Sequence, residues 1–172
     1  MASLMETLID VLHRESELYE ELYGVSSKKT SAIVAGDLKV LAEITEQEQT
    51  MVNRVSAVDR EREVAMRDIA DVLNRDARTM RLTDVVGMLD KRPQEQARLA
   101  KEKDRLTDAI KRLRQVNDQN QVLLQSSLEM VEFEMNVLRS TEQPPETANY
   151  SRMAGMTGDL YGVGRGSFNA GA

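Results

Sequence analysis

Asp10-x-x-His13 is the first pattern in this sequence that could do chemistry, and it contains the single histidine of the chain. The spacing is similar to the Glu-x-x-His unit of di-iron helical bundles. Such sites need that unit twice, together with two further carboxylates that face inward, and the chain has no second copy. We therefore expect His13 to be a surface side chain beside Glu17 on the next turn, and we predict no metal site.

YGVGRG, at residues 161–166, is the second pattern that could do chemistry, because closely spaced glycines can cradle a phosphate. A dinucleotide-binding loop needs a strand before it and a helix after it, and a P-loop needs Gly-Lys-Ser/Thr. Gly162, Gly164 and Gly166 meet neither requirement. Paired acids such as Glu46 and Glu48 face apart on a helix, and the chain has no cysteine. The sequence therefore predicts no enzyme and no cofactor.

The composition indicates an all-α protein. Of 172 residues, 30% are charged and only 3% are aromatic, with ten methionines and three prolines. Such a chain builds its core from aliphatic side chains and Met, which suits helix packing. The net charge of −6 argues against binding nucleic acid or an anionic membrane by bulk electrostatics. The first residues lack the features of a signal peptide and no stretch is apolar enough to insert in a membrane, so we expect a cytoplasmic protein.

Helical periodicity predicts the first long helix over residues 3–34. Alternating steps of four and three residues mark an apolar seam in this segment, which only Glu15 and Lys29 interrupt. Gly36 then provides a helix stop and Asp37 an N-cap, because glycine tolerates a left-handed turn and an aspartate accepts from free amides.

A second seam of the same period predicts a helix over residues 37–74, with Glu48 and Arg62 as its polar interruptions. LTDVVGML then predicts a short apolar helix over 83–89, with Thr83 as its cap. We expect this short helix to plug the end of a bundle between two long helices.

Pro93 suits the first turn of a third long helix, where its missing amide costs nothing. We predict this helix over residues 92–141, and Pro144 with Pro145 ends it. Three long seams with short connections imply antiparallel helices in an elongated, coiled-coil-like bundle.

Two domains of different character follow from this pattern. Residues 1–143 form the predicted helical bundle. Residues 144–172 are small, rich in glycine and without a seam, which is typical of a flexible tail.

Asn117 and Asn120 interrupt the seam of the third long helix. Burying an unpaired amide costs about 1–3 kcal/mol, so these side chains either form hydrogen bonds across the bundle or lie where the seam opens to water. In the first case the pair fixes helix register. In the second it is a polar spot on a groove that binds a partner.

QVLLQSSLEMVEFEMNVL, at residues 121–138, is apolar on more than one face. A helix that is apolar around much of its circumference must bury more than one side. Packing against the first or the short helix is one explanation, and an exposed surface that another protein covers is the other. Met130 and Met135 favour the second, because methionine adapts to varied partners.

Four segments carry a resemblance to a known family. AIVAGDLKVLAEITEQEQTMVNRV (32–55) resembles the second helix of FlgN-type flagellar export chaperones. LTDVVGML (82–89) and LRQVNDQNQVLLQSSLEMVEFEMNVL (113–138) are similar to its later helices, and YGVGRG to the glycine-rich tails of many members. The resemblance covers nearly the whole chain.

The resemblance implies a cytoplasmic chaperone of the flagellar type III export system. Its clients would be hook–filament junction proteins, whose helix-prone terminal segments aggregate when uncovered, and it would deliver them to the export gate or ATPase complex. The family grips clients with its C-terminal region. The client-binding residues that map there are Leu124, Leu128, Val131, Met135, Leu138, Met153, Met156, Leu160 and Tyr161. Tyr150 and Tyr161 are candidates for contacting the gate because they are the tyrosines of the tail.

Two other functions fit the same pattern. A homo-oligomeric coiled-coil structural or adaptor protein would assemble through the helices over 37–74 and 92–141. A regulator of the export ATPase would look like two long helices, and the short apolar helix at 82–89 counts against it. A homodimer is compatible with the chaperone function as well.

Overall fold

The computed structural model describes residues 2–142, and all regular secondary structure in this part of the chain is helical. Helix α1 spans Ala2–Ala35, α2 spans Leu38–Val72, α3 spans Leu82–Gly87 and α4 spans Pro93–Glu142. The prediction of an all-α fold with three long helices and one short helix is confirmed. The predicted ends lie one or two residues from the observed ones.

The chain divides into two units, Met1–Ser127 and Leu128–Ala172. The first unit contains α1, α2, α3 and the first part of α4. The described part of the second unit is the remainder of α4, residues 128–142. The tail predicted over 144–172 lies outside the described residues.

The turn between α1 and α2 follows from its two predicted residues. Gly36 has φ of 66°, in the left-handed region, and its amide donates to Ile33 O at 3.1 Å. The next amide, of Asp37, donates to Ala32 O at 3.1 Å, which completes a Schellman helix end. The Asp37 carboxylate accepts from Val40 N at 3.0 Å and caps α2. The stop and the cap are both confirmed.

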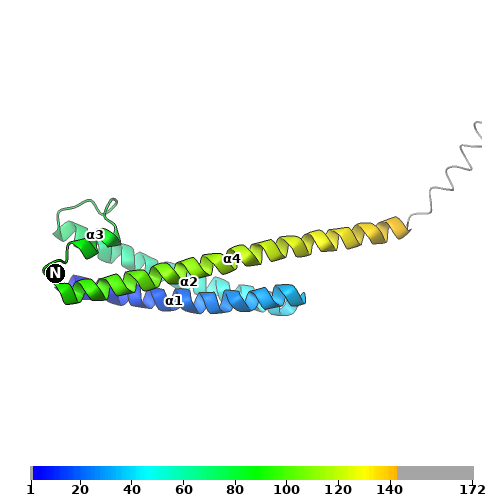
Figure 1. Cartoon of the computed structure of the whole chain (residues 1–172), viewed down its shortest axis with the longest axis horizontal. Coiled ribbons are helices and arrows are strands. Elements are labelled where there is room, and N and C mark those ends of the chain that lie inside the picture. The colour runs from blue at the N-terminus through cyan, green and yellow to red at the C-terminus, as the bar shows by residue number, and fades with distance from the viewer. Residues whose placement is uncertain (1, 143–172) are drawn as a thin grey trace, which may run out of the picture. The chain divides into compact units, whose positions relative to one another are not determined.

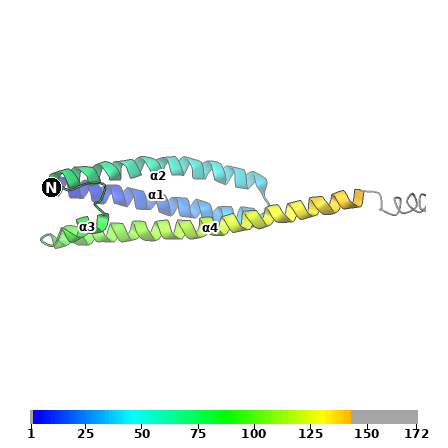
Figure 2. The same ribbon diagram turned by 90° about the horizontal axis from the view of Figure 1, so that it is seen from above.

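Successive long helices of the first unit run antiparallel, so α1 and α4 run parallel (Figures 1 and 2). Arg98 near the start of α4 donates to Glu6 at 2.6 Å and 3.0 Å. Further along both helices, Asn120 Nδ2 donates to Ser26 O at 2.9 Å. Residue numbers therefore rise together along this interface.

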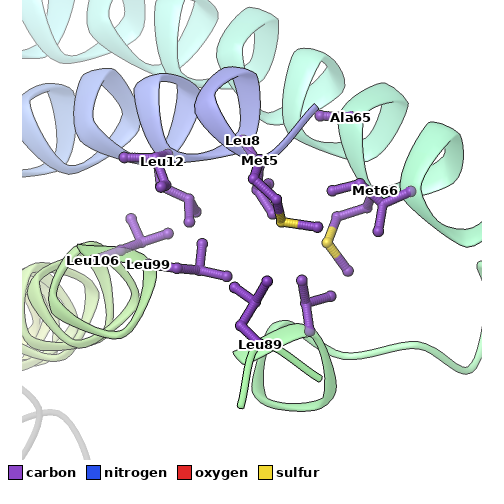
Figure 3. Close-up of a cluster of buried hydrophobic side chains, with 11 residues drawn as sticks. Met5, Leu8, Leu12, Ala65, Met66, Leu89, Leu99 and Leu106 are labelled. Carbon is purple, nitrogen blue, oxygen red and sulfur yellow. The ribbon is translucent and has the colours of Figure 1, made fainter. Parts of the chain in front are cut away.

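The largest hydrophobic cluster gathers all four helices around the N-terminal half of α1 (Figure 3). Val85 of α3 and Leu89 after it fill one side of the cluster, which fits the expected role of a plug. Leu8, Leu12 and Leu99 have no exposed surface. The buried members are Met5, Leu8, Ile9, Leu12, Ala65, Met66, Ile69, Val85, Leu89, Leu99 and Leu106.

The start of α3 differs from the prediction. Thr83 does not cap the helix, because α3 already begins at Leu82. Instead the carboxylate of Asp84 reaches back and accepts from Arg81 N at 2.8 Å, while Asp84 N donates to Arg81 O at 2.9 Å. Pro93 does begin α4, as expected.

Candidate functional site

The side chain of His13 is 46% exposed to solvent, and its ring nitrogens contact charged neighbours. Arg105 lies 3.1 Å from His13 Nδ1. The same nitrogen lies 3.4 Å from the Glu102 carboxylate. On the other side of the ring, Nε2 lies 3.3 Å from Glu17, the neighbour that the sequence predicts.

The surroundings of His13 do not resemble a metal centre. The carboxylate of Asp10, its partner in the motif, accepts from Arg14 Nε at 3.1 Å. Within the described part of the chain, no group of three or more His, Cys, Asp or Glu side chains could hold a metal ion. The arrangement is a network of surface ion pairs.

Glu15 and Arg62 form the first of two charged layers between α1 and α2. Glu15 is only 1% exposed, and Arg62 Nε donates to its carboxylate at 2.9 Å. Arg62 also donates to Asp59. Burial raises the pKa of Glu15 above its ordinary value, the charge of Asp59 raises it further, and Arg62 opposes both.

A second layer joins all three long helices. Lys29 Nζ and Ser26 Oγ both donate to the Glu48 carboxylate, at 2.8 Å and 2.7 Å. The carbonyl of Ser26 accepts from Asn120 of α4, whose side-chain oxygen accepts from Thr30 Oγ1 at 2.6 Å. Asn120 is 3% exposed, so its amide replaces water contacts with two bonds to α1.

Asn117 lies elsewhere, exposed on the surface of α4. Residues three apart on a helix point about 60° away from each other, and only Asn120 faces α1. Each of the two expected arrangements therefore applies to one of the two asparagines. Asn120 forms hydrogen bonds across the bundle and Asn117 meets water. A role for either in helix register or partner binding stays a prediction.

The sequence analysis did not predict that acids and bases of α1 and α2 pair in these two layers, although the sequence contains a signal for this pairing. Glu15 and Lys29 interrupt the first seam two heptads apart, and Glu48 with Arg62 interrupts the second at the same spacing. The charges follow the same order along both seams, with the acid first and the base fourteen residues later. In an antiparallel hairpin this pattern brings each acid opposite a base.

Four of the client-binding residues predicted in α4 belong to the second unit and form one stripe, because steps of four and three return to the same side of a helix. These residues, Leu128, Val131, Met135 and Leu138, are 60%, 55%, 46% and 59% exposed. We call this set of four the first stripe. Leu124, the fifth predicted residue of α4, is half-buried within the first unit.

A second stripe lies on the opposite side of α4 in the second unit and consists of Met130, Phe133 and Val137. These side chains are all exposed, from 43% for Val137 to 68% for Phe133. None of them was among the predicted client-binding residues, although the sequence of 121–138 indicates a helix with apolar residues on more than one face. Contiguous exposed apolar residues mark interaction surfaces in soluble proteins, and α4 presents two.

Glutamates separate the two stripes. Glu132 and Glu134 lie on opposite flanks of the first stripe when α4 is viewed down its axis, since they are two residues apart. Arg139, the single basic residue between 128 and 142, lies seven residues after Glu132 and so on the same flank. The flank of Glu134 is thus negative, whereas the flank of Glu132 carries both signs of charge.

Several predicted residues lie outside the described part of the chain. They are the remaining client-binding candidates, the second candidate gate residue and the glycines of YGVGRG: Met153, Met156, Leu160, Tyr161, Tyr150, Gly162, Gly164 and Gly166. Among residues 2–142, no helix has the length and apolar character needed to cross a lipid bilayer.

The model of the FlgN protein family matches residues 1–158, which include all four helices and both stripes. The chain belongs to the FlgN family. No curated protein and no solved structure matches it.

Membership in the FlgN family makes this protein a flagellar export chaperone. Its partners are flagellar export substrates in general. Among the features of the described residues, the exposed stripes of α4 suit this function best, because a chaperone must present apolar surface that its substrate can cover.

Proposed function

We propose that this FlgN-family protein is a cytoplasmic chaperone of hook–filament junction proteins. It binds their helical terminal segments on the first stripe of α4 and delivers them to the export gate or ATPase complex. The observation that carries the proposal is the exposure of Leu128, Val131, Met135 and Leu138. On a helix, these residues form a continuous apolar face with no polar interruption.

The first stripe suits an amphipathic client helix that lays its own apolar face along α4. Fully burying one side chain such as Leu or Met stabilises a complex by about 1.5–3 kcal/mol. A client that becomes helical only on binding loses conformational entropy at that step, which weakens the complex and favours release. Glu134 favours a client with Lys or Arg beside its apolar face.

The C-terminal residues complete the proposed site. Met153, Met156, Leu160 and Tyr161 would cover the client from the side opposite α4, and Tyr150 or Tyr161 would contact the export gate. The composition of this segment supports the assignment, because Met and Tyr supply adaptable apolar contact area.

The proposal is tested by calorimetry with the C-terminal segment of a junction protein. The full chain is compared with a version that ends at Gln143. We expect tight binding to the full chain and a loss of affinity on truncation. Equal affinity would keep the client and remove the C-terminal residues from the site, and no binding to either version would overturn the proposal.

A double variant tests the stripe itself. Leu128→Glu with Val131→Glu should weaken client binding by about a hundredfold, because two buried apolar contacts become unpaired charges. Helicity by circular dichroism should stay near that of the wild type, since both residues are exposed. The matched control is Met130→Glu with Phe133→Glu on the second stripe. A larger loss of affinity in that control would move the client to the other side of α4.

A further inference from the structure

Residues 73–81, between α2 and α3, concentrate positive charge in a chain whose net charge is −6. Arg75, Arg78 and Arg81 belong to this connection, and Arg67 lies in the last turns of α2. All four are exposed and line one surface hollow of about 810 Å³. We call it the arginine hollow. None of the four forms an ion pair with a carboxylate of the described residues.

The backbone that presents these arginines is fixed by its own hydrogen bonds. Asn74 closes α2 with φ of 53°, and Arg75 N donates to Ala70 O at 2.9 Å, as in a Schellman helix end. The Asp76 carboxylate then accepts from Arg78 N at 2.9 Å, and Asp76 O accepts from Met80 N at 3.2 Å. A partner therefore meets arginines on a preformed turn, which lowers the entropy that binding must overcome.

The lining of the hollow indicates the chemistry of that partner. Guanidinium groups bind carboxylates in a bidentate geometry, whereas Met80 and Leu82 add half-buried apolar surface. Glu63, Asp71 and Asp76 also line the hollow, so a dense polyanion such as nucleic acid would meet repulsion there. A peptide in which acids alternate with apolar side chains satisfies both kinds of lining.

We propose that the arginine hollow is a docking site for an acidic, partly apolar segment of another protein. The hollow belongs to the first unit and shares no residue with either stripe of α4. The site does not depend on the client assignment. It gives the chaperone a second contact, made by charge, besides the apolar contact that α4 offers to a substrate.

Fluorescence anisotropy of the full chain tests the proposal with a labelled peptide of Ala-Glu-Glu-Leu repeats. Arg75→Gln with Arg78→Gln should weaken binding by about tenfold, since two charged pairs are lost. The matched control, Arg112→Gln with Arg114→Gln, removes the same charge from the surface of α4 and should leave affinity unchanged. Arg75→Lys with Arg78→Lys keeps the charge and the fold, and should lose part of the affinity because the bidentate geometry is lost.

Four results would overturn the proposal. Equal weakening in the control pair would reduce the effect to net charge. Equal affinity for an Ala-Gln-Gln-Leu peptide would remove the carboxylates from recognition. Tighter binding of single-stranded DNA, lost in the Arg75/Arg78 variant, would assign the hollow to nucleic acid. Self-association of the wild type that this variant abolishes, measured by sedimentation, would assign it to a second copy of the chain.

Discussion

The α1–α2 hairpin and the end of α4 distribute polar and apolar residues in opposite ways. In the hairpin, charged side chains lie inside an apolar seam, and each finds a partner across it. From residue 128 to 138, apolar side chains lie on the outside of a helix and the charges form its flanks. The first pattern is complete within one chain, whereas the second needs a partner to cover it.

This difference shows how an interrupted seam and an uncovered stripe can be told apart. A polar residue in a seam costs most stability when it has no partner, and Glu15, Glu48 and Asn120 all have one. An exposed apolar stripe costs nothing to the helix but exposes the protein to association. Stability measurements should therefore separate the two regions.

The largest expected effect is a difference in the free energy of unfolding between a leucine variant in the core and one in the first stripe. Leu12→Ala in the main cluster should lower the free energy of unfolding by about 2–5 kcal/mol, because it leaves a cavity in a fully buried site. Leu128→Ala should change it by less than about 0.5 kcal/mol, since this side chain is exposed. Urea titration followed by circular dichroism measures both values. A large loss at Leu128 that grows with protein concentration would mean that a second copy already covers the stripe.

A smaller effect distinguishes the two asparagines of α4. Asn120→Ala removes the partner of Ser26 O and Thr30 Oγ1, and should cost about 1–3 kcal/mol of unfolding free energy. Asn117→Ala, an identical change on the exposed side of the same helix, should stay within about 0.5 kcal/mol. Equal costs, measured by thermal unfolding, would contradict a bridging role for Asn120 alone.

The smallest expected effect is that two glutamates of α1, Glu15 and Glu20, contribute to stability with opposite dependence on pH. Burial raises the pKa of Glu15, so the folded state holds its proton more tightly than the unfolded state. The contribution of Glu15 to stability therefore falls as pH rises above its ordinary pKa. Hydrogen bonds from Arg105 lower the pKa of Glu20, and its contribution is lost as pH falls below the ordinary value.

Thermal unfolding across the acidic range tests both signs against glutamine variants. The advantage of the wild type over Glu15→Gln should shrink as pH rises, whereas its advantage over Glu20→Gln should grow. The second effect should be small, because solvent screens a pair as exposed as Glu20 and Arg105. Parallel slopes for the two variants would show that burial does not control the titration of Glu15.

Local chemistry made much of the fold predictable from the sequence. Gly36, Asp37 and Pro93 act through the conformations of their own backbone and neighbours, so the turn and the start of α4 follow directly. The prediction that Thr83 caps α3 was wrong because α3 begins at Leu82, which places Thr83 inside the helix, and the Asp84 carboxylate accepts from Arg81 N instead. The residue that caps a helix changes when the helix begins one residue earlier or later.

Contacts between helices were harder to predict than the helices themselves. Choosing Asn120 over Asn117 requires the rotation of α4 about its axis, which periodicity leaves open when the seam is interrupted. The arginine hollow depends on a connection of nine residues, 73–81, that has no periodicity at all. Its geometry comes from the hydrogen bonds of Asp76, and the sequence shows only that the segment is basic.

The placement of the four charges in the two seams also has a consequence for how the hairpin forms. If α2 slid along α1 by two heptads in one direction, Glu15 would meet Glu48, and in the other direction Lys29 would meet Arg62. Either slip would bury like charges, although the apolar positions would still match. The four charges therefore make both slipped registers less stable than the observed one.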